Sequence, residues 1–466
     1  MKTKLRDRMV AIMAFLTIVG FVNAQTTVTD FAGLQSALTA GGDIIIGAPI
    51  TIPSDFTMAP SVPITITTTG PFTPAQPLLS VTGGTLTIGN NVTINAGGVA
   101  NAISAMAGGS VVINGGVISS TATSPLNVAG GTITVNGGTI TTSNFPAAAA
   151  GSSIGSGGTL IVNGGVLSTT NTGTLTRGIV VDYGGTCYVN GGEIHADPSV
   201  SGRGISINST NSGGKLYITG GTITAAGSSG RAIQLDNANA FLSVSGSPVI
   251  SGGLEGIIAQ KGGIVIIQGT PSIKGIIGCN SSTTTGQVYD CRHITPIVAN
   301  PVAGSYTTDQ PVTLTGGMVD RYNSTNQTTP VSVPATLVYT TDGTTPTTTS
   351  AVYTAPVTAV APATTITVTP MINNILIGDP VAFTYTIATG ITAPQAVGKV
   401  NSLIVNTIDA SAIEGVQDIT VYDLTGRVVL SAHNQSVVDA SSLSTGAYIL
   451  QVKTAKGGFT QRVVKQ

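Results

Sequence analysis

Charged residues are scarce in this sequence: Asp, Glu, Lys and Arg together make up 8% of its 466 residues, and tryptophan is absent. From Phe56 to Thr176 there is no Asp, Glu, Lys, Arg or His. That stretch therefore cannot supply a general acid, a general base or a charged metal ligand. The formal net charge is −1, which argues against nucleic acid as a partner. We predict neither a metal site nor a cofactor.

Long apolar runs are also scarce, and one stands at the start of the chain. Residues 1–24 are predicted to be a secretory signal peptide, because four basic residues precede the apolar run Met9–Val22 and Ala24 closes a small-residue cleavage site. Its removal takes away four positive charges and one negative charge, which moves the formal net charge from −1 to −4. No later stretch is long and apolar enough to span a membrane, so we expect no transmembrane segment in the mature chain.

Glycine is abundant, with 61 residues, and it recurs in a fixed pattern. The clearest copy is Gly-Gly-Thr-Ile-Thr-Val-Asn-Gly-Gly-Thr-Ile (Gly130–Ile140), and related copies begin at residues 83, 108, 157, 184, 213, 239 and 262. Successive copies are spaced by 22 to 29 residues. Self-similarity at this period is typical of a solenoid, in which each unit buries its apolar face by stacking on its neighbours.

Alternation within the repeat predicts strands. Residues of one parity are apolar in every copy and those of the other parity are mostly polar, as in Thr132–Val135, and successive side chains of a strand point to opposite faces. Two further short apolar segments in each repeat give three strands per turn. We therefore predict an all-β fold: a right-handed parallel β-helix over residues 81–294, followed by two small β-sandwich domains. A column of asparagines at one corner predicts an asparagine ladder: Asn114, Asn136, Asn163 and Asn190.

Residues 25–80 are predicted to form the N-terminal cap and the first turns. Phe31, Leu34 and Leu38 have helical spacing, and Asp30 is a suitable N-cap. A short helix there would cover the open end of the solenoid and prevent edge-to-edge association. This helix-then-strand start resembles that of pectin-lyase-like β-helix proteins.

The charged residues of the solenoid gather in its later turns. Arg177, Arg203 and Arg231 occupy equivalent places in the repeat. Turns of a β-helix stack at about 4.8 Å, so we expect these arginines to form a column. Asp182 and Asp236 lie five residues beyond the first and the third arginine and would belong to a second column nearby.

Tyr188 and Tyr217 share an outward position on adjacent turns. Together with the arginine column they could bind an acidic or neutral glycan, through bidentate hydrogen bonds and ring stacking. Alternatively, the arginines and aspartates are solvated surface charges, and each Arg–Asp pair contributes under about 1 kcal/mol to stability. No catalytic residue is predicted.

The chain has only three cysteines. Cys187 has the inward parity and is expected to be a buried, apolar residue. Cys279 and Cys291 flank a polar loop just after the last turn. In an exported protein they could form a disulfide that ties down the exit of the solenoid.

The glycine repeat stops near residue 295. Residues 295–390 contain short alternating segments separated by turn signals, which predicts a small β-sandwich. The segment Tyr-Thr-Thr-Asp-Gly-Thr-Thr-Pro-Thr (Tyr339–Thr347) resembles the chitobiase/β-hexosaminidase C-terminal-type domain, an immunoglobulin-like accessory module, with Asp342 and Gly343 at its hairpin turn. The resemblance implies a non-catalytic, accessory role.

Three segments near the end of the chain carry a second resemblance: Ile419–Val429, Val438–Leu450 and Arg462–Gln466. They are similar to the type IX secretion system C-terminal sorting domain, and we predict such a domain over residues 391–466. The resemblance implies handling by the type IX secretion machinery and passage across the outer membrane. The product would be secreted or attached to the outer-membrane surface.

Three functions are consistent with these patterns. The first, which we favour, is an exported non-catalytic protein that binds a polysaccharide or surface glycan or acts in adhesion. The second is a polysaccharide lyase or hydrolase that uses the later turns, in which two carboxylates, or Asp182 or Asp236 together with an arginine, converge in a groove. The third is a structural spacer that binds no ligand.

Overall fold

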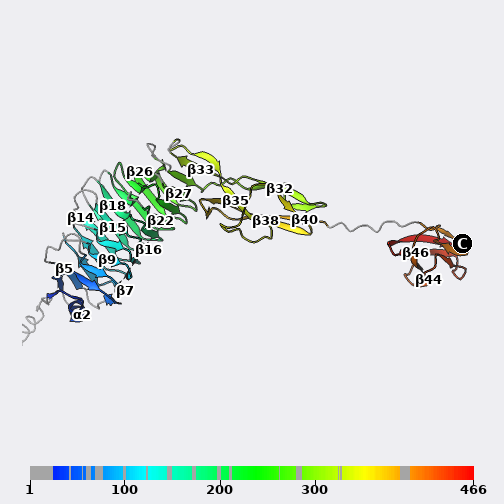
Figure 1. Ribbon diagram of the computed structural model, residues 1–466, viewed down its shortest axis with the longest axis horizontal. Helices are drawn as coiled ribbons and strands as arrows, with labels where there is room; N and C mark the ends of the chain where they lie inside the picture. Colours follow the sequence, from blue (N-terminus) through cyan, green and yellow to red (C-terminus); the bar gives the residue numbers. More distant parts are fainter. Residues whose placement is uncertain are drawn as a thin grey trace, which may run out of the picture. The chain divides into compact units, whose positions relative to one another are not determined.

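The computed structural model (Figure 1) describes residues 25–40, 43–54, 56–58, 64–68, 77–97, 101–121, 124–143, 149–170, 175–196, 201–208, 212–261, 263–279, 286–323, 325, 328–388 and 399–466. The predicted signal peptide lies outside these residues. Among them α2 (Phe31–Ala40) is the only helix, and all other regular elements are strands. The predicted fold class is confirmed: the chain is all-β, with a parallel β-solenoid of about eight turns followed by β-sheet domains.

Each complete turn of the solenoid contributes three strands, and equivalent strands of successive turns pair in parallel to form three columns. Figure 1 shows equivalent strands of successive turns as stacked rungs, for example β15 and β18. The first column contains β1 (Thr26–Val28), β2 (Ile44–Ile46), β5 (Ile64–Thr68), β8 (Val92–Asn95), β11 (Val117–Ser120), β14 (Thr139–Ser143), β17 (Val166–Thr170), β20 (Glu193–Ala196), β23 (Thr222–Ala225), and the first parts of β26 (Val249–Ala259) and β28 (Ser272–Cys279).

The other two columns follow the same rule. The second contains β3 (Ile50–Ile52), β6 (Leu79–Val81), β9 (Ile103–Met106), β12 (Leu126–Ala129), β15 (Ala149–Gly155), β18 (Thr176–Val181), β21 (Arg203–Ile207), β24 (Arg231–Leu235) and the later parts of β26 and β28. The third contains β4 (Phe56–Met58), β7 (Gly84–Ile88), β10 (Gly109–Ile113), β13 (Thr132–Val135), β16 (Thr159–Val162), β19 (Thr186–Val189), β22 (Lys215–Ile218), β25 (Phe241–Val244), β27 (Ile264–Ile267) and β29 (Gln287–Asp290).

The inward positions of the third column form two unbroken rows of apolar side chains. In-register pairing places Ile133 between Val111 and Leu160. Every member of the two rows is 0% exposed: Leu86, Val111, Ile133, Leu160, Cys187, Leu216, Leu242 and Val265 in one, and Ile88, Ile113, Val135, Val162, Val189, Ile218, Val244 and Ile267 in the other. Burying one large side chain of this kind contributes about 1.5–3 kcal/mol, so the turns are held together by a single shared core.

The corner between the third and the first column is made by the Asn-Gly-Gly segment. At Gly138 φ is +87°, and an added Cβ would lie 2.8 Å from the carbonyl carbon of Gly115 in the previous turn. At Gly137 an added Cβ would lie 2.7 Å from the carbonyl oxygen of Asn114. Backbone conformation therefore requires glycine at the second position, and the close approach of the previous turn requires it at both.

Asparagine side chains at these corners form the ladder that the sequence predicts. Nδ2 of Asn136 donates to Oδ1 of Asn114 at 2.9 Å, and Asn163 and Asn190 each repeat this bond to the turn before at 2.9 Å. The hydroxyl of Thr219 donates to Oδ1 of Asn190 at 3.0 Å and extends the series by one turn. The ladder links successive turns without placing like charges beside one another.

The N-terminal end of the solenoid is covered by α2. Asp30 caps the helix, because its Oδ1 accepts a hydrogen bond from the N–H of Gly33 at 2.7 Å. Leu34 is 0% exposed and belongs to the solenoid core. The ring of Phe31 packs edge-on against that of Phe56, with the centroids 5.0 Å apart. The predicted helix and its N-cap are both present.

The third column ends in an antiparallel hairpin. Its last parallel strand, β29, pairs with β33 (Met318–Asn323), which pairs in turn with β34 (Val331–Pro334). On the outer side of β27, Ile266 belongs to a buried cluster with Val319 and Ile377. The sheet of the solenoid thus continues past the change of composition near residue 295.

Most of the remaining strands between residues 295 and 390 are short, and the longest, β38, has 10 residues. β35 pairs in antiparallel fashion with β36 and with β38, and β31 pairs in parallel with β40. At the predicted hairpin turn Gly343 has a φ of +82°, and Oδ1 of Asp342 accepts from the N–H and the hydroxyl of Thr344. The strands are β30 (Val298–Asn300), β31 (Gly304–Tyr306), β32 (Gln310–Thr315), β35 (Thr336–Thr340), β36 (Ala351–Val352), β37 (Val357–Ala359), β38 (Ala363–Ile372), β39 (Ile375–Leu376) and β40 (Val381–Ile387).

The C-terminal domain has its own core. Five strands form a sheet in the order β41-β47-β46-β43-β44, and β42 pairs with β45. Ile419, Val421, Leu450 and Val452 are fully buried in it. At the turn after β43, hydrogen bonds to the Asp423 carboxylate lower its pKa to about 2, and the bond from the Thr425 hydroxyl makes the largest contribution. The strands are β41 (Leu403–Ile404), β42 (Thr407–Asp409), β43 (Val416–Tyr422), β44 (Val428–His433), β45 (Val437–Asp439), β46 (Gly446–Thr454) and β47 (Gly457–Lys465).

Replacing Gly138 by Ala is expected to destabilise the solenoid by about 2 kcal/mol or more, because the new Cβ is strained at positive φ and also collides with the previous turn. Urea unfolding followed by circular dichroism would show a lower midpoint. Gly97→Ala is the matched control: φ there is +57° and no atom lies within 4 Å of an added Cβ, so only the conformational cost of about 1 kcal/mol is expected. If Gly138→Ala and Gly97→Ala lost the same stability, the close approach of the previous turn would not be the reason for glycine at position 138.

Candidate functional site

The outward face of the second column carries a grid of polar side chains in its later turns. Parallel register places Arg177 beside Arg203, Arg203 beside Arg231, and Arg231 beside Glu255. Three residues further along each strand, the register row runs through Val180, Ser206, Gln234 and Ile258. A third row of polar residues follows directly after the strands and contains Asp182, Asn208, Asp236 and Gln260.

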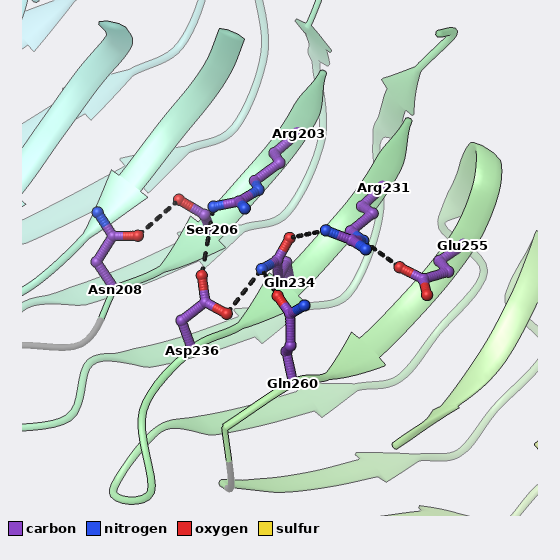
Figure 2. Close-up of polar contacts among 8 residues, drawn as sticks. All are labelled: Arg203, Ser206, Asn208, Arg231, Gln234, Asp236, Glu255 and Gln260. Atoms are coloured by element: carbon purple, nitrogen blue, oxygen red, sulfur yellow. Dashed lines mark hydrogen bonds and ion pairs between the residues drawn. The ribbon is translucent and has the colours of Figure 1, made fainter. Parts of the chain in front are cut away.

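The side chains of this grid bind one another both within a turn and between neighbouring turns (Figure 2). Nη1 of Arg203 donates to Oδ2 of Asp236 at 3.3 Å, so the pair joins one turn to the next. Nε2 of Gln234 donates to the other oxygen of Asp236 at 2.7 Å, and Oε1 of Gln234 accepts from Nη1 of Arg231 at 3.2 Å. Arg231 also forms an ion pair with Glu255, and Gln234 contacts Gln260. Gln234 therefore lies at the centre of the network, which we call the polar cluster.

Burial sets the electrostatics of the polar cluster. The side chains of Arg203 and Asp236 are only 14% and 12% exposed, and Gln234 is 0% exposed. Burial lowers the pKa of the Arg203 guanidinium from its ordinary value, and the attraction of Asp236 opposes that shift. The pKa of Arg177 is lowered for the same reason, against the attraction of Asp236 and Asp182.

The three arginines of the grid are balanced by three carboxylates, those of Asp182, Asp236 and Glu255. Because an added anion would compete with carboxylates already in place, the grid offers no net positive charge to an acidic ligand. Its accessible groups are planar hydrogen-bonding groups held in fixed positions. Among the described residues, no three His, Cys, Asp or Glu side chains converge as they would around a metal ion.

The predicted tyrosine pair lies on a different strand column from the arginines. Tyr188 and Tyr217 belong to β19 and β22 of the third column, with ring centroids 5.1 Å apart and ring planes 13° from parallel. Tyr217 also packs against Phe241, with centroids 5.6 Å apart. Because the tyrosine rings stack on each other, the faces between them are closed to a sugar ring. The structure therefore places the predicted tyrosines and arginines on separate strand columns, and a shared glycan site that includes both stays a prediction.

Sequence reasoning missed the central member of the polar cluster, Gln234, and its neighbour Ser206. Both are buried on the outward side of their strands, where Ser206 donates to Oδ1 of Asn208 at 3.3 Å. The signal was present in the alternation of Ile205-Ser206-Ile207 and of Ile233-Gln234-Leu235. A polar residue between two inward apolar residues marks an outward position.

The predicted disulfide is not formed, and all three cysteines are free thiols. Cys279 belongs to the core inside the solenoid, whereas Cys291 belongs to the outer cluster that contains Ile266 and Val319. The two thiols therefore face different apolar clusters. Burial raises the pKa of Cys279 to about 11 and that of Cys291 to about 12, and it also raises the pKa of Cys187.

Two family models match parts of the chain. The secretion system C-terminal sorting domain matches residues 401–466, and the Fn3 associated family matches residues 327–385. No curated protein and no solved structure matches. The second match supports an Fn3 associated module in this region and not the specific chitobiase-type assignment that the sequence suggested.

The first match establishes where the protein goes. A chain with a type IX sorting domain is exported by the type IX secretion system and is secreted or located on the cell surface. Within the described residues, no helix has the length and apolar character needed to cross a membrane.

Asp236→Ala is expected to lower the free energy of unfolding by about 2–3 kcal/mol, because the nearly buried Arg203 would lose its counter-charge and Gln234 an acceptor. Thermal or urea unfolding of the purified chain measures this loss. Glu193→Ala is the control, since Glu193 pairs with His195 at 3.0 Å but is 57% exposed, and its removal should change stability by about 0.5 kcal/mol or less. A loss no larger than that of the control would show that the polar cluster is a set of ordinary surface pairs.

The cysteines are expected to be unreactive in the folded protein near pH 8. Thiolate is the reactive form, and the raised pKa values of Cys279 and Cys291 keep both protonated at that pH. Alkylation with iodoacetamide followed by mass spectrometry should label none of the three in buffer and all three in urea without reductant. Labelling of Cys187 alone in urea would instead indicate the disulfide.

Proposed function

We propose that this exported protein is a non-catalytic glycan-binding protein, and that the polar cluster binds an uncharged sugar chain. The observation that carries the proposal is the fixed network around Gln234, in which Arg231, Asp236 and Gln260 all contact one side chain. Sugar hydroxyls both donate and accept, so they are well matched by guanidinium, carboxylate and amide groups whose positions are already set.

Further donor capacity supports the proposal. The side chain of Arg203 is 14% exposed, and its guanidinium carries five N–H donors, one of which, on Nη1, is engaged by Asp236. Gln260, at the edge of the polar cluster, is only half-buried. The balance of charges across the grid favours a neutral glycan over an acidic one.

The state of the carboxylates supports a binding role over a catalytic one. Each oxygen of Asp236 accepts a hydrogen bond within the cluster, one from Gln234 and one from Arg203, and Glu255 is held by Arg231. A general base needs a lone pair directed at its substrate, and these groups direct theirs at neighbouring side chains.

The test is a glycan array, together with a polysaccharide-degradation screen, on the full secreted chain. Binding to neutral glycans is expected, and Gln260→Ala should weaken it about tenfold, in line with the loss of a hydrogen bond. Arg203→Ala should weaken it further, while Lys274→Ala, a change on β28 outside the cluster, should leave it unchanged. Circular dichroism confirms that each variant is folded.

The other outcomes are equally informative. Release of oligosaccharide products would overturn the non-catalytic assignment and direct attention to Asp236 and Asp182. Absence of binding to any glycan would favour the spacer. Binding that persists in both cluster variants would place the glycan elsewhere on the protein.

A further inference from the structure

The outer face of the third column forms an ordered array without any charge between β7 and β19. One of its rows consists of hydroxyl side chains in parallel register: Thr85, Ser110, Thr132, Thr159 and Thr186. The next position in this row is Lys215, so the charge-free part of the row ends there. Each hydroxyl residue of the row is partly exposed.

Two further rows run beside the hydroxyl row. The middle row contains Thr87, Val112, Thr134, Ile161 and Tyr188, and Tyr188 at its end is 38% exposed. The third row is the exposed asparagine ladder at the corner. We call these three rows together the neutral face.

The asparagine ladder still offers hydrogen bonds to a partner. A side-chain amide has two N–H donors and two acceptor lone pairs. In the ladder, Asn136 donates once to Asn114 and accepts once from Asn163, which leaves one donor and one acceptor position. All four asparagines are exposed, so the same remaining groups are repeated along the row.

The spacing of the neutral face is regular in two directions. Neighbouring strands lie about 4.8 Å apart, and alternate residues of one parallel strand lie about 6.6 Å apart. Five strands carry the hydroxyl and middle rows and four of them carry the asparagine row, so the array is about 19 Å long and about 13 Å wide. A flat array of this kind touches only one side of a partner, so each contact is weak, but many equal contacts act together on a partner that is itself periodic.

The absence of charge selects the partner. Charged residues typically make up about a quarter or more of the surface residues of a soluble protein. A charged side chain in contact with a neutral solid would lose its hydration without compensation. The neutral face places hydroxyl, amide and small apolar groups where charges are otherwise expected, and these groups match a surface of sugar hydroxyls. We propose that the neutral face binds the surface of an insoluble, uncharged polysaccharide. This inference rests on the proposed glycan-binding function but uses a face other than the polar cluster.

The experiment is a pull-down of the full chain with microcrystalline cellulose and with chitin powder. Retention on at least one solid is expected, with little difference between about 0.15 M and about 1 M NaCl, because no ion pair contributes. Thr134→Lys, which places a charge in the middle row between Val112 and Ile161, should reduce retention about tenfold. Thr159→Glu, a second variant with the opposite charge in the hydroxyl row, should act in the same direction.

Thr141→Lys is the matched control. Thr141 lies on β14 of the first column, in the same turn as Thr134, and is also partly exposed, so this variant adds the same charge on another face and should bind as the wild type does. The glycan array on the wild type separates the two proposals, since soluble glycans can fail to bind the polar cluster while the neutral face still retains the chain on the solid.

Three results would overturn the proposal. The first is no retention of the wild type on either solid. The second is equal loss of retention in Thr134→Lys and Thr141→Lys. The third is a wild-type dimer in sedimentation velocity that Thr134→Lys dissociates, because the neutral face would then be occupied by a second copy of this chain.

Discussion

The in-register stacking of every strand on its counterpart one turn away is the constraint on which this structure depends. Turns lie only about 4.8 Å apart, so each outward side chain stands beside its counterpart, and like charges in one row repel strongly. Neutral residues satisfy this constraint without cost, as the bonds from Asn136 to Asn114 and from Asn163 to Asn136 show. The long stretch without charges, from Phe56 to Thr176, is the simplest sequence that satisfies it.

Two arginines of the solenoid take their counter-charge from the next turn. Arg203 pairs with Asp236, which lies one turn further on and outside the arginine row, and Arg231 pairs with Glu255, its register neighbour in the next turn. These counter-charges offset the repulsion between stacked arginines. Gln234 joins the two pairs, since it donates to Asp236 and accepts from Arg231. The polar cluster is therefore a consequence of stacking as well as a candidate binding site.

Features that depend on register alone could be predicted from the sequence. The buried apolar rows and the asparagine ladder follow once the repeats are aligned, because equivalent residues must stack. Features that depend on side-chain orientation or on contacts between non-equivalent residues could not be predicted in this way. The stacking of Tyr188 on Tyr217 depends on ring orientation, and the central role of Gln234 depends on its contacts with the non-equivalent residues Arg231 and Asp236. The separation of Cys279 from Cys291 depends on which apolar cluster each thiol enters.

Stacking also explains how one solenoid can carry two independent surfaces. In a repeat protein each turn contacts only its neighbours, so the core fixes the inward residues and leaves the outward ones free to vary. The neutral face occupies the third column up to β19, whereas the polar cluster occupies the second column from β21 to β26. A change on one surface leaves the hydrogen bonds of the other intact, because no turn supplies residues to both. The sorting domain determines that both surfaces reach the outside of the cell, and their chemistry, one charge-free and the other charge-balanced, favours an uncharged ligand at each.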